Sequence, residues 1–355
     1  MTRRTLLSVV IATVAVARPA TAQSVERNFE RLAESIAAAA ERMASRVERH
    51  ATSLASRIEA EFERQGRLRD RDDDDRSDRQ LEHQAQRIDT TFAFSGTGVI
   101  DVSSAFGDIV VTGWERREAR IKASTGRGRL EYELSSSRII IEQRSGGRTD
   151  RDIDSRYEIS IPRGARLILH STSGDIEVRN AGGEVEVSST SGDVTVAGSS
   201  GRVDANTVSG DLTLRDIKGN VDGNTVSGSI EATGLEGDIH LGSTSGDLFV
   251  SDARGRDVEL STTSGEVSYA GTVDANGRYE FNSHSGTINL AIPAGTNARF
   301  SVETFSGEID SDFPITLQPG DRTSSRPRRF EFNLGAGGPR IIAESFSGDV
   351  EIRKR

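Results

Sequence analysis

Acidic side chains that follow glycine at regular intervals are the first residues in this sequence whose chemistry could define a function. The acid comes directly after a Ser-Gly pair at Asp175, Asp193, Asp211, Asp247, Asp349, Glu266 and Glu308. Stacked carboxylates of this kind could bind Ca²⁺, which takes roughly six to eight oxygen ligands. Calcium-binding nonapeptide repeats carry the pattern Gly-Gly-x-Gly-x-Asp, however, and Ser229 and Thr287 interrupt the acidic series here. We therefore expect the aspartates to accept hydrogen bonds from backbone amides at turns.

The serines that precede these glycines offer hydroxyls, but nothing around them would activate a nucleophile. The sequence has no Gly-x-Ser-x-Gly elbow. It has no cysteine, which excludes disulfides, thiolate nucleophiles and cysteine metal sites. The histidines lack the His-Glu-x-x-His spacing of zinc proteases and lie at His50, His83, His170, His240 and His284. We predict that the chain is not an enzyme and has no catalytic, cofactor-binding or metal-binding residues.

The glycines themselves recur every nine residues and indicate the elements that hold these side chains. They lie at Gly174, Gly183, Gly192, Gly201, Gly210, Gly219, Gly228, Gly237, Gly246 and Gly255. Serine precedes alternate members, so the full unit has 18 residues with one Ser-Gly-Asp turn and one plainer glycine turn. After each glycine apolar and polar residues alternate, which is typical of a strand with one buried face. Each unit is therefore predicted to contain two short strands.

Two short strands per unit, repeated many times, predict an all-β protein built as a β-solenoid of stacked two-strand coils. Fixing the backbone of 18 residues costs roughly 18–36 kcal/mol. Burying four aliphatic side chains returns only about 6–12 kcal/mol, so each coil needs the coils on either side of it. Ile176, Val194, Leu212, Ile230 and Leu248 should form one buried row.

We expect ten coils, of which Phe106-Gly107-Asp108 opens the series and 346–349 closes it. Residues 312–340, which contain Pro314, Pro319 and Pro327, should form a long excursion before the last repeat. The β-solenoid domain is predicted to cover residues 91–355. The arginines of the excursion and of 353–355 could form a patch that docks an anionic partner, although a solvated loop and tail fit them better.

Three different segments precede this domain. Residues 1–22 are typical of a signal peptide, with Arg3 and Arg4 before a short apolar run and Ala-Thr-Ala before the cleavage site. The sequence is compatible with export by the general secretory route and with export by the twin-arginine route. Residues 23–66 predict an amphipathic, coiled-coil-like helix, because apolar residues recur at steps of three or four from residue 25. Residues 67–90 are almost all polar and predict a charged, disordered linker.

Composition limits the partners. Loss of the signal peptide removes three arginines and takes the formal net charge from −10 to −13. Such an acidic protein should not bind nucleic acid or anionic membranes. The mature chain shows no apolar run long enough for a transmembrane span. We expect an exported protein, periplasmic or secreted, that could form a homo-oligomer through residues 25–66, with docking of the helix along the solenoid as the alternative.

Several stretches of the repeat resemble a family of exported bacterial β-strand-repeat proteins called putative adhesins, a domain of unknown function. The resemblance rests on the repeated T-x-SG-D unit and the closing sequence GPRIIAESFSGDVEIRKR. It also rests on two Ile-Pro-x-Gly lead-ins, in ISIPRGARLILHSTSGDIEV (159–178) and LAIPAGTNARFSVETFSGEI (290–309). It covers about residues 91–355. The resemblance implies stacked β-coils in the bacterial envelope or outside the cell, and it supplies no catalytic residues.

The function predicted from these observations is that of an exported, non-enzymatic scaffold or binding protein. It would present ladders of serine, threonine and aspartate to an unknown envelope protein or polysaccharide. Two alternatives remain open: a polysaccharide-active β-helix enzyme of the envelope, and a calcium-stabilised repeat module.

Overall fold

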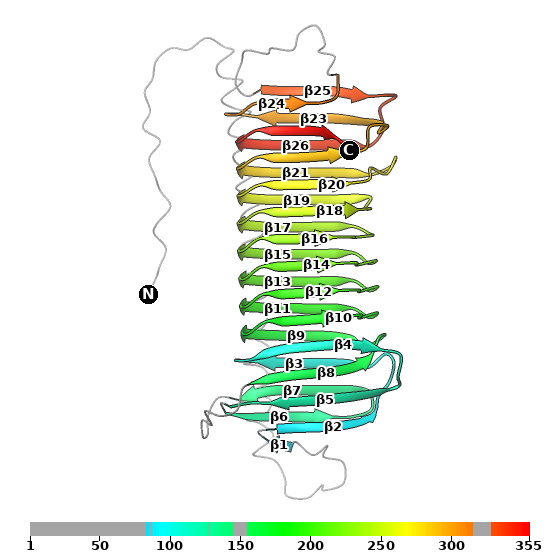
Figure 1. The fold of residues 1–355 in the computed structure, drawn as a ribbon, viewed down its shortest axis with the longest axis vertical. Helices are drawn as coiled ribbons and strands as arrows, with labels where there is room; N and C mark the ends of the chain where they lie inside the picture. The colour runs from blue at the N-terminus through cyan, green and yellow to red at the C-terminus, as the bar shows by residue number, and fades with distance from the viewer. Residues whose placement is uncertain (1–82, 86, 127, 145–154, 315–327) are drawn as a thin grey trace, which may run out of the picture.

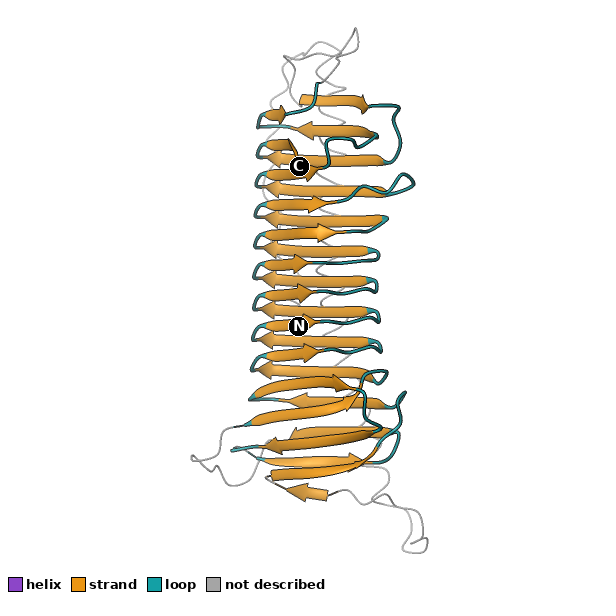
Figure 2. Cartoon of the chain, turned by 45° about the vertical axis from the view of Figure 1, so that its right-hand side comes forward, coloured by secondary structure: helices purple, strands orange, loops and turns teal. Residues whose placement is uncertain are grey.

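Each 18-residue unit forms one coil that contributes one strand to each of two sheets (Figure 1). The computed structural model describes residues 83–85, 87–126, 128–144, 155–314 and 328–355. Within these residues the structure consists of strands and short connections, and the coils stack into one elongated body (Figure 2). The predicted all-β architecture of stacked two-strand coils is therefore present.

The first sheet, sheet A, has 14 strands. In spatial order from the end nearest the N-terminal strands they are β1 (His83–Ala85), β6 (Arg129–Leu134), β7 (Arg138–Arg144), β3 (Val99–Ser104), β9 (Arg166–Ser173), β11 (Val185–Ser191), β13 (Val203–Ser209), β15 (Val221–Ser227), β17 (Ile239–Ser245), β19 (Asp257–Ser264), β21 (Arg278–Ser285), β26 (Arg340–Ser347), β23 (Ala298–Thr304) and β25 (Arg328–Leu334).

The second sheet, sheet B, has 13 strands. In the same direction they are β2 (Arg87–Ala93), β5 (Glu118–Ser124), β8 (Arg156–Pro162), β4 (Asp108–Trp114), β10 (Ile176–Arg179), β12 (Val194–Ala197), β14 (Leu212–Arg215), β16 (Ile230–Thr233), β18 (Leu248–Ala253), β20 (Val267–Gly271), β22 (Ile288–Ile292), β27 (Val350–Lys354) and β24 (Ile309–Ser311).

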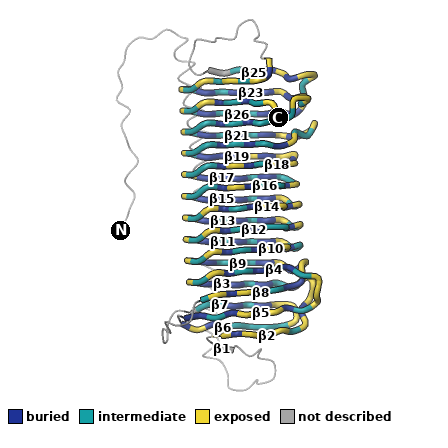
Figure 3. The backbone as a smooth tube through the Cα atoms, viewed as in Figure 1, coloured by how far each residue is buried: buried dark blue, intermediate teal, exposed yellow. Residues whose placement is uncertain are grey.

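Equivalent residues of successive coils lie directly beside one another. The predicted buried row is confirmed, because parallel strands pair in register at Ile176, Val194, Leu212, Ile230 and Leu248. All five side chains are buried. Buried and exposed positions alternate along the strands, as Figure 3 shows. The inward side chains of both sheets form one continuous hydrophobic core, which runs through the stack.

At the N-terminal end, the spatial order of the coils differs from their order in the sequence. Coil β3–β4 lies between coil β7–β8 and coil β9–β10 in both sheets. The chain therefore passes over coil β3–β4 on its way from β8 to β9. The first Ile-Pro-x-Gly sequence, which includes Pro162 and Gly164, lies at this step.

The C-terminal end repeats this arrangement. Coil β26–β27 lies between coil β21–β22 and coil β23–β24. The second Ile-Pro-x-Gly sequence, with Pro293 and Gly295, lies where β22 leads to β23. The predicted order was therefore wrong: the coil with Phe106-Gly107-Asp108 lies inside coil β7–β8, and the coil with residues 346–349 lies inside coil β23–β24. Alternation of apolar and polar residues identifies a strand but does not identify its neighbours.

Antiparallel strands close both ends of the stack. β5 pairs antiparallel with β2 and β8, β6 pairs with β1 and β7, and β25 pairs with β23. Two predicted boundaries need correction as a result. The 312–340 excursion contains β25, and the linker predicted for 67–90 overlaps β1 and the start of β2. In β2 the alternation that buries Ile88 outweighs the charged composition on which the linker prediction relied.

Other predictions concern residues that the structure does not describe. The signal peptide (1–22), the helix (23–66) with its proposed self-association, and the linker up to residue 82 lie outside the described residues. Within the part of the chain that is described, no helix has the length and apolar character needed to cross a bilayer.

Candidate functional site: the turn edge

The turn that leads from sheet A to sheet B contains the serine, glycine and acid that the sequence analysis selected. In coil β13–β14 it consists of Thr207, Val208, Ser209, Gly210 and Asp211. We call these positions, in order, the first hydroxyl, the variable residue, the second serine, the turn glycine and the turn acid. Successive turns lie above one another and form one side of the molecule, the turn edge (left in Figure 1).

The first hydroxyl is buried in the described turns, and from Thr207 onward it connects adjacent coils. The Thr225 hydroxyl donates to the Gly210 carbonyl oxygen of the neighbouring coil at 3.2 Å. The same bond, between 2.9 and 3.2 Å long, is donated to the turn glycine of the adjacent coil by Ser243, Thr262, Ser283, Thr304 and Ser345. A buried carbonyl without a partner would cost about 1–3 kcal/mol, so a serine or threonine is needed here. Half of the predicted hydroxyl ladder therefore lies inside the protein.

The turn glycine allows adjacent coils to approach closely. A Cβ atom at Gly210 would lie 2.2 Å from the Gly192 carbonyl oxygen, and one at Gly228 would lie 2.1 Å from the Gly210 carbonyl oxygen. The backbone amide of Gly192 donates to the Ser209 carbonyl at 3.3 Å across the same gap. Any side chain would have to push the two coils apart.

The turn acid accepts a hydrogen bond from the next coil. Asp193 Oδ1 accepts the backbone N–H of Asp211 at 2.9 Å, and Asp211 Oδ1 accepts that of Ser229 at 2.8 Å. Where serine replaces the acid, Ser229 Oγ accepts the N–H of Asp247 at 3.4 Å. The predicted role in amide capping is confirmed, with the difference that the amide belongs to the neighbouring coil. Among the described residues no group of three or more histidine or acidic side chains could hold a metal ion.

The variable residue and the second serine remain on the surface. All second serines from Ser173 to Ser347 are exposed. The variable residue is threonine, valine or an aromatic residue, and Val208 exposes 37% of its surface. Towards the C-terminal end three rings stack from coil to coil: His284 on Phe346 at 4.8 Å and Phe346 on Phe305 at 5.2 Å. The turn edge thus offers hydroxyls and small apolar groups at one-coil intervals of about 4.8 Å.

Acidic and amide side chains flank the turn edge on the outer face of sheet A. One row in register contains Glu186, Asp204, Asp222, His240, Glu259 and Glu280. Amides of the next row orient these acids: Asn206 Nδ2 donates to Asp204 at 2.6 Å, and Asn224 Nδ2 donates to Asp222 at 2.9 Å. This face is therefore acidic and ordered by hydrogen bonds between side chains.

Two of the described histidines contact an acidic side chain or a ring. His240 Nε2 lies 3.8 Å from Asp257 Oδ2, and the His284 ring stacks on Phe346. Neither contact involves a serine hydroxyl. His170 lies on the outer face of sheet A, beside Ser188 in register. His50 and the side chain of His83 lie outside the described part.

Sequence reasoning missed two groups of residues. Asn180, Asp216 and Asp252 adopt left-handed backbone at the second reversal, with φ of 57°, 53° and 50°, which favours these residue types or glycine. These three residues are spaced 36 residues apart, and Gly198 and Gly234 lie midway between them, so a left-handed residue recurs every 18 residues; this spacing was the available signal.

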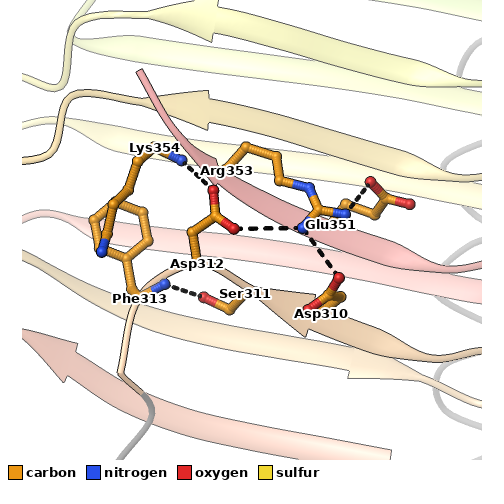
Figure 4. A network of polar contacts seen from close by, with 7 residues as sticks. All are labelled: Asp310, Ser311, Asp312, Phe313, Glu351, Arg353 and Lys354. Atoms are coloured by element: carbon orange, nitrogen blue, oxygen red, sulfur yellow. Dashed lines mark hydrogen bonds and ion pairs between the residues drawn. The ribbon is translucent and has the colours of Figure 1, made fainter.

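The second missed group is an ion-pair network at the C-terminal end (Figure 4). Arg353 lies 3.0 Å from Asp310 and 3.4 Å from Asp312, and the Lys354 backbone N–H donates to Asp312 at 3.0 Å. This last bond, with the nearby cations, lowers the pKa of the Asp312 carboxyl. A hydrogen bond to Glu351 and the neighbouring acids raise the pKa of Arg353. Nothing in the local sequence shows that 310–312 and 351–354 are neighbours, because a cap strand separates them.

Comparisons with known proteins are consistent with this architecture. The model of the Toastrack DUF4097 family matches residues 46–240 and 220–353. No curated protein matches significantly.

Solved structures give remote similarities. A "putative adhesin" from Bacteroides fragilis is 11% identical, with 75% of this chain and 96% of that chain covered and a TM-score of 0.36. A "putative adhesin" from Parabacteroides distasonis is 12% identical over 76% and 98% of the two chains, with a TM-score of 0.23. A "putative cell adhesion protein" from Clostridium sporogenes is 10% identical over 76% and 100%, with a TM-score of 0.19. Family membership therefore rests on the family model, whose two matches cover most of the repeat: the chain belongs to the Toastrack DUF4097 family.

Proposed function

We propose that this protein is an exported, non-enzymatic scaffold that binds a polymer or protein of the bacterial envelope or extracellular space along its turn edge. One observation carries the proposal. In coils from β13–β14 onward the first hydroxyl, the turn glycine and most turn acids contact the neighbouring coil, whereas the second serine is exposed and the variable residue is exposed or half-buried. A linear partner could thus meet the same groups at every coil.

The chemistry of the turn edge favours an uncharged partner such as a neutral glycan. Exposed hydroxyls exchange hydrogen bonds with the hydroxyls of sugars, and the threonine methyl, valine and ring groups pack against apolar sugar faces. The adjacent acidic face of sheet A would repel anionic polymers. The names of the remote structures from Bacteroides and Clostridium agree with a role in binding, and the predicted signal peptide agrees with export.

Co-sedimentation with insoluble cellulose and with chitin, which are both uncharged, tests the proposal. A variant with Thr190→Glu, Val208→Glu and Thr244→Glu places charges on the turn edge. Phe249→Glu is the matched control, because Phe249 exposes 41% of its surface on the outer face of sheet B. We expect the wild type and the control to sediment with at least one polymer, and the edge variant to stay in solution.

The outcomes separate this proposal from its alternatives. Binding that survives the edge substitutions would move the site elsewhere, and the absence of binding to both polymers would contradict the proposal of an insoluble neutral glycan as the partner. Release of soluble sugar during the incubation would favour the polysaccharide-active enzyme. A melting temperature that rises with added Ca²⁺ and falls with chelator would favour the calcium-stabilised module.

A further inference from the structure

The coil formed by β26 and β27, residues 340–354, fills a place between two coils to which it is not directly joined. We call it the closing coil, and we call the space between coil β21–β22 and coil β23–β24 the slot. In Figure 1 the red β26 lies between the yellow-orange β21 and the orange β23. In the sequence, the closing coil follows the outer coil, β23–β24, and the cap strand β25.

The slot supplies the ladder bonds of the closing coil from both sides. On one side, the Ser345 hydroxyl donates to the Gly286 carbonyl at 3.1 Å, and the Ile288 amide donates to the Asp349 carbonyl at 2.9 Å. On the other side, the Thr304 hydroxyl donates to Gly348 at 2.9 Å, and Asp349 Oδ1 accepts the Glu308 amide at 2.8 Å. None of these four bonds depends on the covalent link between β25 and β26.

Two features match the closing coil to this slot rather than to another place in the stack. Its variable residue, Phe346, stacks between the rings of His284 and Phe305, whereas the central coils carry threonine or valine there. Its Arg353 pairs with Asp310 and Asp312 of the outer coil (Figure 4). Rings and charges therefore fix both the place and the register.

A glycine-rich hinge joins the closing coil to the rest of the chain. Residues 335–339 read Gly-Ala-Gly-Gly-Pro, and Gly335 and Gly337 have φ of 57° and 76°. Asn297 Oδ1 accepts the Ala336 amide at 3.0 Å. Glycine changes between left-handed and extended backbone at little cost. Extended, the five residues span about 17 Å, enough to carry the coil out of the slot while β25 stays paired with β23.

We propose that the closing coil is exchangeable, and that the slot of one molecule receives the closing coil of a second copy of this chain. Reciprocal exchange gives a twofold dimer in which all bonds of the slot are made again, now between molecules. Because the contacts are the same, only hinge strain and protein concentration decide between monomer and dimer. The slot is thus an interface for the identical segment of a second copy.

Disulfide cross-linking between two chains tests this proposal. Because the sequence has no native cysteine, only the introduced cysteines can form disulfides. Asn282 in β21 and Glu344 in β26 are partners in register on the outer face of sheet A. Their Cα atoms lie about 4.8 Å apart, within the range that a disulfide bridges. One chain carries Asn282→Cys and the other Glu344→Cys; the two are mixed, unfolded in urea, refolded together and oxidised. The matched control pair is Glu259→Cys with Glu280→Cys, partners in β19 and β21, on the same side of the slot.

We expect a disulfide-linked heterodimer, identified by its mass, for the pair that spans the slot and not for the control pair. Deletion of Gly337 and Gly338 should increase the dimer fraction in size-exclusion chromatography, because a short, strained hinge favours exchange. A single chain with both Asn282→Cys and Glu344→Cys shows whether the geometry permits the bond. If that chain forms its internal disulfide while the mixed chains give no more heterodimer than the control, the closing coil is not exchanged and the proposal is wrong.

Discussion

Replacement of one turn glycine tests the claim that close approach of the coils, rather than backbone flexibility, requires glycine in the Ser-Gly-Asp turn. In Gly210→Ala the new methyl carbon would lie 2.2 Å from the Gly192 carbonyl oxygen and 2.7 Å from its carbonyl carbon. Atoms that are not bonded rest about 3.5 Å apart, so the two coils must separate by about 1 Å at this turn.

Separation of the coils weakens the bonds that cross the gap. The Gly192 amide to Ser209 carbonyl bond is already 3.3 Å long, and the Asp211 amide to Asp193 carboxylate bond is 2.9 Å. Loss of both costs about 2 kcal/mol. Overpacking in a rigid region adds about 1–3 kcal/mol, so the free energy of unfolding should fall by about 3–5 kcal/mol.

Urea unfolding followed by far-UV circular dichroism measures this loss. With a slope of about 3 kcal/mol per molar urea, the midpoint should fall by about 1 M or more. Gly295→Ala is the matched control, because its new Cβ would have no atom within 4 Å. That variant should be neutral or more stable by up to about 1 kcal/mol. Equal midpoints for the two variants would refute the argument from close approach.

Two further predictions follow from the turn and from the ion-pair network. Thr225→Val keeps the shape of the side chain but leaves the Gly210 carbonyl without its donor, so urea unfolding should show a loss of about 1–2 kcal/mol, whereas Thr244→Val on the surface should change little. The carboxyl of Asp312 has a lowered pKa, so its contribution is present above the ordinary carboxyl pKa of about 3.9 and is lost as the pH falls through the lower folded value. Melting temperatures of the wild type and of Asp312→Asn should therefore differ at neutral pH and converge in acid; a constant difference would contradict this assignment.

Sequence alone predicts the middle of this fold well, because one physical constraint acts there repeatedly. In parallel in-register stacking each residue lies beside its own equivalent, so an 18-residue period places Val194 beside both Ile176 and Leu212. The turn acids were predictable for the same reason. Glycine before an acid predicts a turn, and stacked turns bring the carboxylate of Asp193 to the amide of Asp211.

The two ends could not be predicted from the same signals. The sequence of β26 and β27 fits any place in the stack, since its Ser-Gly-Asp turn and alternation match those of every other coil. Its place is decided by long-range partners, among them Phe305 for Phe346 and Asp312 for Arg353. The Ile-Pro-x-Gly sequences did contain a local signal. Proline removes an amide from the ladder, which suits a residue that leaves one coil and steps over the next.

Recurring and varying residues of the turn have different tasks, and this explains why so regular a motif says little about the ligand. Thr207, Gly210 and Asp211 recur in type because stacking requires a donor, a close approach and an acceptor at these places. Val208 makes no such contact between coils, so the residue type at this place in the turn can vary while the coils stay stacked.

Under the proposed function, information about the partner would lie in the variable residues and in the outer face of sheet A, where side chains differ from coil to coil. Threonine and valine occupy the middle of the turn edge, while the rings of His284, Phe346 and Phe305 gather at the C-terminal end. Rings bury more surface against a partner than threonine does, so affinity along the turn edge should not be uniform. Phe346 belongs to the closing coil. If that coil is exchanged between copies, then the strongest part of the turn edge is completed by the second molecule, and binding and dimerisation become coupled.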